Sequence, residues 1–360
     1  MGVNLRNSLN NGLNTGLRQS ISGGPGVAFA FLEYTTVAST SSFTLRSTGT
    51  VDYEVDWGDG TVESYTTNTP THTYSTADTY TIKITPADGS TYRPYFANNV
   101  SDTSIAKVNG TGGSQLGTTL QQAWQGSSNM TFFSADIDTS GVTGMRATWH
   151  QCSGLTSFPL IDTSGCTFFF QAWSGCSGLT SFPLIDTSSG TNFSNAWAGC
   201  SGLTSFPLLD TSSGDNFALA WKGCSGLTSF PLIDTSSGGS FYAAWQNCSG
   251  LTSFPAIDFS SATQFNQAWR SCSSLATFPA NMFDTTGTLV SNAFSSAFNA
   301  CALTAQSIEN ILVSLDANGQ SNNSLHIGGG TNAAKTTWST AANNAYDNLI
   351  ADGWTITYNA

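Results

Sequence analysis

The amino-acid sequence contains few charged residues and especially few basic ones. Only 9% of its 360 residues are Asp, Glu, Lys or Arg, and 10 Lys and Arg stand against 22 acids to give a net charge of −12. An ordinary soluble domain has roughly 25% charged residues. Proteins that bind nucleic acid neutralise phosphates with clustered Lys and Arg. Because no basic run occurs, the sequence argues against DNA and RNA as partners.

Long apolar runs are missing as well. The longest one near the start, residues 27–32, is far shorter than the roughly 18 to 20 residues that cross a bilayer, so no membrane insertion is expected. Residues 1–26 separate their leucines with polar residues and lack the basic and then apolar order of a secretory signal. The sequence therefore predicts a chain that folds in the cytosol. Its 39% hydrophobic residues still provide enough apolar material for a core.

Residues typical of catalysis or cofactor binding are scarce. The histidines His72, His150 and His326 lie in different parts of the chain, and no nucleophile or pair of carboxylates recurs around them. The three glycines at 328–330 lack the strand and helix that surround a phosphate-binding loop. The sequence therefore predicts no enzyme, no catalytic residue and no cofactor.

What the chain has instead is an internal repeat of 24 residues, of which one copy reads CSGLTSFPLLDTSSGDNFALAWKG. A unit of this length cannot bury its own apolar stripe, so the units are expected to stack into a solenoid. Cys, Trp and Pro mark the period at Cys152, Cys176, Cys200, Cys224, Cys248 and Cys272, at Trp149, Trp173, Trp197, Trp221, Trp245 and Trp269, and at Pro159, Pro183, Pro207, Pro231, Pro255 and Pro279.

Each unit is predicted to form a short strand, a turn and a helix. Pro207 cannot donate to a sheet ladder, so it should end the strand around Phe206. Asp and Ser oxygens of the turn would cap the helix, and Gly202 would end it in the left-handed conformation. The helix is inferred from spacing i, i+3, i+4 and i+7, which places four side chains on one helical face. In one unit these are Phe193, Ala196, Trp197 and Cys200.

The chain outside the repeats divides into further regions. Residues 28–86 alternate apolar and polar positions, as in SFTL, TVDYEVDW and HTYSTADTYTIKI, which predicts a small antiparallel β-sandwich. Residues 87–118 are expected to be a linker or the N-terminal cap of the solenoid. The solenoid itself is expected to cover residues 119–303. Residues 304–360 form a C-terminal cap with a helix in SIENILVSL, a second helix over residues 342–351 and a closing strand in WTITYN. The first helix should turn inward Ile308, Ile311, Leu312 and Leu315.

Two of these regions resemble known families. The segment VDWGDGT with the later HTYSTADTYTIKI resembles a polycystic-kidney-disease (PKD) type immunoglobulin-like domain, with Asp78 where that family often has Gly. The repeats, which read A-W-x-x-C-S-G-L, resemble the A-F-x-x-C-x-x-L of BspA-like leucine-rich repeats. The resemblance implies a multidomain chain, in which an all-β immunoglobulin-like (PKD-like) sandwich precedes an α/β leucine-rich-repeat solenoid with a C-terminal α/β cap. Both modules serve display and adhesion in many contexts.

The combination of both modules with this C-terminal segment resembles virion structural proteins of tailed bacteriophages. That resemblance implies a non-catalytic structural or adhesion protein on the virion surface, folded in the host cytoplasm, as a tail fibre, spike or capsid decoration that contacts a host glycan or surface protein. A BspA-like bacterial cell-surface adhesin is the alternative. A glycan-active enzyme is disfavoured, because no paired carboxylates occur in a cleft-forming context. Self-association of the chain is left open.

Residues 1–27 are expected to form an N-terminal anchoring arm. Its leucines step by four residues, but its glycines and asparagines make a poor helix, so the arm should be ordered only when something holds it. We therefore expect it to attach the protein to other virion proteins through Leu5, Leu9, Leu13 and Leu17.

Three columns of the stacked units need an interpretation. The cysteines lack the C-x-x-C spacing of a zinc site and are interpreted as buried free thiols, with Cys166, out of register, as the more exposed one. The Trp column is interpreted as core rather than as a platform for sugars or single-stranded nucleic acid. A third column of carboxylates could bind Ca²⁺, but local turn capping is favoured. Its members are Asp162, Asp186, Asp210, Asp234 and Asp258.

Asp56 and Asp59 of the WGDG motif are likewise expected to hold their turn through backbone hydrogen bonds rather than a cation.

Overall fold

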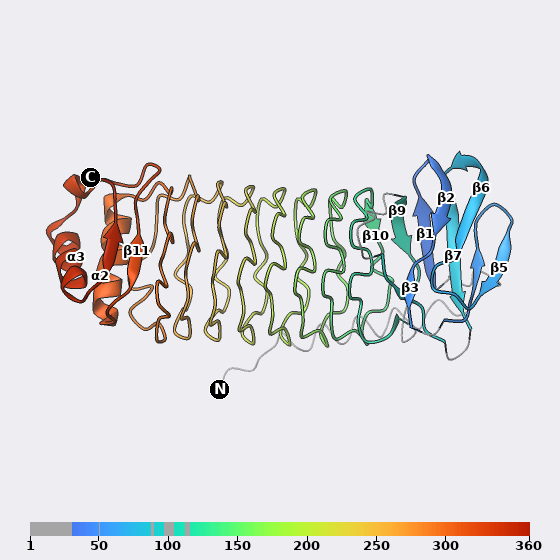
Figure 1. Cartoon of the computed structure of the whole chain (residues 1–360), viewed down its shortest axis with the longest axis horizontal. Coiled ribbons are helices and arrows are strands. Elements are labelled where there is room, and N and C mark those ends of the chain that lie inside the picture. The colour runs from blue at the N-terminus through green and yellow to red at the C-terminus, as the bar shows by residue number, and fades with distance from the viewer. Residues whose placement is uncertain (1–30, 50, 88–89, 97–103, 112–115) are drawn as a thin grey trace, which may run out of the picture.

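The computed structural model describes residues 31–49, 51–87, 90–96, 104–111 and 116–360. The molecule is elongated, with a β-rich region at one end, a stack of coils in the middle and a pair of helices at the other end (Figure 1). The leucines of the expected N-terminal anchor lie outside the described residues.

The β-rich region, residues 31–111, has two layers. Its main sheet has the order β9-β1-β7-β4-β5 and is extended beside β9 by β10 of the first coil, while β2 pairs with β6 and β3 with β8. Rings of the two layers meet in the core, for example Tyr34 with Phe43 at 6.1 Å and Tyr53 with Tyr92 at 5.2 Å between centroids. The strands are β1 Leu32–Thr36, β2 Thr40–Thr44, β3 Ser47–Thr48, β4 Tyr53–Asp56, β5 Val62–Tyr65, β6 Thr71–Asp78, β7 Thr81–Pro86, β8 Arg93–Pro94, β9 Ile105–Asn109 and β10 Phe132–Phe133.

The alternation seen in the sequence sets the register of these strands. In β7, Ile82 and Ile84 are buried while Lys83 between them is exposed. Tyr34 of β1 lies opposite Ile82 in the antiparallel ladder, so apolar side chains of both strands share one face.

One sheet crosses the junction between the β-rich region and the coils. Strand β9 pairs antiparallel with β1 and parallel with β10, and β10 belongs to the first coil. The buried side chains on both sides of this junction form one continuous hydrophobic cluster. The β-rich region is therefore packed onto the end of the stack rather than linked to it by a hinge.

The coil stack, residues 119–303, contains no α-helix, so the helix predicted in each unit is wrong. The N–H groups of alternate residues donate to carbonyls of the next coil, as from Phe193 to Asn216 and from Trp197 to Ala220, both at 2.9 Å. The N–H groups between them close turns three residues back, as from Cys200 to Trp197 at 3.1 Å. A helix would bond every N–H within its own segment, whereas here half of them hold the stack together.

Left-handed residues make this alternation possible, and they are not the ones expected. Asn195 has φ 56° and Gly199 φ 76°, whereas Gly202 is not among the residues with positive φ. Gly202 is needed for a different reason. A Cβ there would lie 2.6 Å from the carbonyl oxygen of Ser177 in the preceding coil, closer than side-chain atoms approach.

The strand predicted around Phe206 is also absent. Pro207 has no N–H to donate, and the neighbouring chain segments are held there by single bonds such as Thr204 N–H to Thr180 O at 3.4 Å. Most bridges between coils join one residue of each coil, for example Asn192 with Asn216, and the described extended segments have a single bridge, Ser253 with Thr277. The unit is thus an extended segment followed by a ladder of turns.

Aromatic columns fill the interior of the stack. Successive tryptophans from Trp124 to Trp269 stack with centroids 5.4–5.8 Å apart, and Phe298 continues the column at 4.8 Å from Trp269. Phenylalanines form parallel columns on either side, such as Phe182 on Phe206 at 6.2 Å and Phe193 on Phe217 at 5.5 Å. The side chains predicted to face inward are therefore confirmed as core.

The C-terminal cap closes the stack with helices α2, Ala305–Asn318, and α3, Thr340–Ala351. The 3-10 turn η2, Lys335–Thr337, precedes α3, and β11, Ser324–His326, pairs parallel with β12, Thr355–Thr357. Both predicted helices and the closing strand are confirmed, and neither helix has the length and apolar character of a membrane span among the described residues. The residues expected inward, Ile308, Ile311, Leu312 and Leu315, are all buried.

Candidate interaction surface

The segment after each proline places one leucine and one aspartate on the outside of the stack. In one coil Leu184 and Asp186 are exposed while Ile185 and Thr187 are buried, as expected for an extended chain whose side chains alternate. The same four-residue pattern recurs in successive coils. We call the resulting surface the Leu–Asp face, formed by Leu160, Leu184, Leu208 and Leu232 and by Asp162, Asp186, Asp210, Asp234 and Asp258.

The leucines of this face are the most exposed large apolar side chains of the described residues, at 62–64% of their surface. In the last of the five coils Ala256 takes the place of leucine. Sequence reasoning missed these leucines because the apolar segment was interpreted as a strand that ends at proline. The signal was the alternation L-I-D-T that follows the proline.

Buried threonines fix the face from behind. The hydroxyl of Thr187 donates to the carbonyl oxygen of Asp210 in the next coil at 2.5 Å, and Thr163 does the same to Asp186. The phenylalanines two residues before these leucines stack with centroids 5.8–6.2 Å apart, which gives the spacing from coil to coil on this side of the stack. The Leu–Asp face is therefore a regular array with one carboxylate in each of five coils and one leucine in each of the first four.

Each aspartate of the face holds its own turn. Oδ1 of Asp186 accepts from the backbone N–H of Ser188 at 3.0 Å and from its hydroxyl at 2.6 Å. In the equivalent turn, hydrogen bonds from Ser236 hold the pKa of Asp234 below its ordinary value. The expected local turn role is thus confirmed, while the helix that these residues were also expected to cap is absent. Nowhere in the described part of the chain do three His, Cys, Asp or Glu side chains gather as metal ligands would.

Basic residues stand apart from the Leu–Asp face. The coil stack contains only Arg146, Lys222 and Arg270. Lys222 and Arg270 directly follow a tryptophan of the turn ladder, and the guanidinium of Arg146 lies over the ring of Phe170 at 5.3 Å. The extended segments that carry the face therefore have carboxylates and no cation.

The cysteine column belongs to the interior. All eight cysteines are free and buried, and the Sγ of Cys200 donates to the carbonyl oxygen of Trp173 in the preceding coil at 3.1 Å. Burial raises the pKa of Cys248 and of Cys301 to about 12. Cys166 is buried as well, with a pKa raised by burial to about 11, so its expected exposure is wrong. These thiols are structural.

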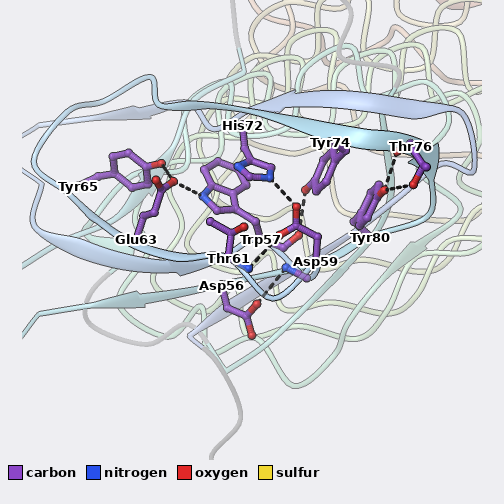
Figure 2. A network of polar contacts seen from close by, with 11 residues as sticks. Asp56, Trp57, Asp59, Thr61, Glu63, Tyr65, His72, Tyr74, Thr76 and Tyr80 are labelled. Carbon is purple, nitrogen blue, oxygen red and sulfur yellow. Dashed lines mark hydrogen bonds and ion pairs between the residues drawn. The ribbon is translucent and has the colours of Figure 1, made fainter.

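The WGDG turn of the β-rich region is braced by its own side chains (Figure 2). Asp56 Oδ1 accepts from the N–H of Gly58 at 2.9 Å, and Asp59 Oδ1 accepts from the N–H of Thr61 at 3.0 Å, which confirms their expected turn role. The other oxygen of Asp59 bonds His72 Nε2 at 2.8 Å, and this hydrogen bond lowers the pKa of Asp59. The His72 ring stacks on Trp57 with centroids 5.0 Å apart.

The other two histidines have separate structural partners. His150 Nδ1 bonds the carbonyl oxygen of Ser174 at 3.0 Å, and His326 Nε2 lies 3.0 Å from the amide nitrogen of Asn299. Burial lowers the pKa of both imidazoles. The three histidines thus remain in three different environments.

An open hollow of about 590 Å³ lies beside the WGDG turn. Lys83 stands between Glu33 and Asp56 on adjacent strands and lines the hollow with them and with Gly58. Its lining is polar and of mixed charge, without the apolar walls and converging polar groups of a typical ligand pocket.

Comparison of the chain with protein-family models, with curated proteins and with solved structures finds no match. Among the described residues, the Leu–Asp face is the regular array that carries exposed large apolar side chains and carboxylates.

Proposed function

We propose that the chain is a non-catalytic structural and adhesion protein displayed on a tailed-phage virion, as a tail fibre, spike or capsid decoration that contacts the host surface. The observation that supports this function is repetition on the outside of the stack. The same exposed pair of leucine and aspartate returns in coil after coil on a framework held by inter-coil hydrogen bonds. Weak contacts at many equal sites add up to firm attachment.

The proposal includes the family character of the two modules. The β-rich region is proposed to be PKD-like, supported by the WGDG turn that Asp56 and Asp59 brace. The coil stack is proposed to be a BspA-like leucine-rich-repeat solenoid. This is supported by the buried Cys and Trp, which recur at the same positions of successive repeat units. Its turn ladder replaces the helix that such a repeat was expected to contain.

The proposal also assigns the N-terminal residues to assembly. Residues 1–27, with Leu5, Leu9, Leu13 and Leu17, would hold the protein on other virion proteins, which leaves the stack free for host contact.

Deletion of residues 1–25 tests this assignment. We expect the truncated protein to keep the thermal transition and circular dichroism of the full chain and to be missing from purified particles in mass spectrometry. The full-length chain is the matched control. Incorporation at the level of the full-length chain would exclude the anchor. Detection of the full-length chain on bacterial surfaces but not in particles would favour the alternative, a bacterial cell-surface adhesin.

A further inference from the structure

We propose that the Leu–Asp face is a docking surface for a basic amphipathic helix of a partner polypeptide. The inference deepens the proposed display function, on which it rests, because it names the surface of the stack that makes contact and the chemistry of its partner.

The apolar part of the argument is the leucine column. Single exposed apolar side chains are normal, but contiguous ones mark interaction sites. Leu160, Leu184, Leu208 and Leu232 are neighbours along the axis, in segments whose phenylalanines stack 5.8–6.2 Å apart. The other exposed large apolar side chains are Val62, Phe132, Phe168, Val290, Val313 and Ile350, which occupy different elements or coils.

The charge argument selects the sign of the partner. Two residues after each leucine, on the same side of an extended segment, stands an exposed carboxylate, as Asp186 does after Leu184. One oxygen of that carboxylate is engaged in its turn, as is Oδ1 of Asp186, which leaves the other able to meet a partner. A row of such carboxylates attracts Lys and Arg and repels a second acidic surface. A second copy of this chain, with its net charge of −12, would bring a like row against it.

The spacing selects the form of the partner. Side chains on one face of a helix recur at i, i+3, i+4 and i+7 and lie about 5 to 6 Å apart, close to the 5.8–6.2 Å between the stacked phenylalanines of successive coils. A helix that lies along the stack therefore places one apolar side chain beside each leucine. Three steps between four leucines span about 18 Å, which corresponds to roughly twelve residues of helix. Lys or Arg on the flank of the same helix reaches the aspartate column. In this mode an amphipathic helix is recognised through its apolar face, with side chains at i, i+3, i+4 and i+7 as the contacts.

The test uses the full-length protein and a synthetic helix of leucines at i, i+4, i+7 and i+11 with lysines on its flanks. A scrambled peptide of the same composition and a peptide with glutamate in place of lysine are the controls. Titration calorimetry at low and high salt gives the dissociation constants. We expect binding of the Leu/Lys helix that weakens with salt, and at least about tenfold weaker binding of both control peptides.

Matched variants locate the site. The double variant Leu184→Ser with Leu208→Ser should lose about tenfold or more in affinity. The double variant Asp186→Asn with Asp210→Asn should bind with a weaker salt dependence, because two of the five carboxylates are gone while the Asn oxygens keep the turns. The control variant Val313→Ser should bind like the wild type, because it replaces an apolar residue of α2 that is 39% exposed and lies away from the Leu–Asp face. Thermal transitions check that each variant is folded.

Equal binding of the Leu/Lys and scrambled peptides, or unchanged affinity in both double variants, would overturn the proposal. Self-association of the wild type that disappears in the leucine variant would assign the face to a second copy instead. Virion incorporation is measured separately, so loss of peptide binding with normal incorporation refutes this inference alone, and binding without incorporation refutes the display function alone.

Discussion

Tryptophan is buried in both main regions of the molecule, but the hydrogen bonding of its indole N–H differs between them. In the β-rich region the Nε1 of Trp57 donates to Glu63 at 3.1 Å. In the coil stack the indole nitrogens, fully buried, have no nitrogen or oxygen acceptor among the described residues. These are the nitrogens of Trp124, Trp149, Trp173, Trp197, Trp221, Trp245 and Trp269.

Magnitudes explain why the stack tolerates these unpaired donors. An unsatisfied buried polar group costs about 1 to 3 kcal/mol. A buried tryptophan removes roughly 150 to 250 Å² from water, which at about 25 cal/mol per Å² contributes about 4 to 6 kcal/mol. Its ring also meets phenylalanines at a steep angle, such as Trp173 with Phe182 at 4.9 Å and 78°. Apolar burial therefore outweighs the lost hydrogen bond in every coil, and a polar partner in each coil would interrupt the phenylalanine columns.

The stability of the two regions should differ most strongly in its response to alkaline pH, because all eight cysteines lie in the coil stack. Burial raises the pKa of Cys248 to about 12 from its ordinary 9.0, and those of Cys200 and Cys224 also lie well above that value. Above about pH 9 the unfolded chain loses these protons while the folded stack keeps them. The free energy of unfolding should therefore fall as pH rises from 9 toward 12.

Urea unfolding at pH 7, 9 and 10 measures this loss, and mass spectrometry after alkylation counts the thiols that have reacted. We expect all eight thiols to react in urea and almost none in the folded protein at pH 8. The β-rich region should respond about one pH unit later, because its titrating groups are tyrosines, such as Tyr53 with a pKa raised by burial from 10.0 to about 12. A urea midpoint that is the same at pH 7 and pH 10 would contradict the expectation.

Substitution of one central tryptophan should have the next largest effect. Trp221→Ala removes the ring between Trp197 and Trp245, which stack on it at 5.8 and 5.5 Å. The free energy of unfolding should fall by about 3 to 5 kcal/mol, as measured by urea titration. Trp221→Phe should cost much less, because Phe298 already continues the column on Trp269 at 4.8 Å.

The matched substitution in the β-rich region sharpens the comparison. Trp57→Phe loses the same ring volume and also the hydrogen bond to Glu63. It should therefore cost about 1 kcal/mol more than Trp221→Phe. Equal costs would mean that the unpaired indoles of the stack have partners after all.

A turn aspartate should have the smallest effect of the three. Asp186→Ala removes the acceptor for the N–H and hydroxyl of Ser188 and should cost about 1 kcal/mol. Asp186→Asn keeps an oxygen at the same position and should change the free energy of unfolding by less than about 0.5 kcal/mol. The contrast between Ala and Asn in thermal unfolding distinguishes a turn bond from a charge effect, since both variants remove the charge.

The sequence predicted the contents of the core better than the backbone around it. The inward positions of Trp197 and Cys200 followed from their period and are confirmed, as are both helices of the C-terminal cap. The helix of the repeat was wrong because a ladder of turns of three to four residues also turns every third or fourth side chain inward. The periodicity of apolar side chains cannot distinguish the two.

The candidate surface was predicted only in part. The aspartate column and its turn role were visible in the sequence, since an Asx turn depends on residues two positions apart. The leucine column was not, because an apolar residue after a buried Phe reads as core until its neighbours are known. Leu184 is exposed because Ile185 takes the inward place and Pro183 starts an extended segment.

The sequence by itself determined that the Trp and Cys columns lie inside the stack and at what interval, because these apolar side chains recur at one position of successive units. Only the tertiary structure decided where the backbone N–H groups go. The acceptor for Phe193 is the carbonyl of Asn216, in the next coil, and no local feature identifies it. Each coil in the stack finds carbonyl acceptors in the next coil and N–H donors in the preceding one. The ladder of turns therefore forms backbone hydrogen bonds as a helix would, and these bonds also join the coils.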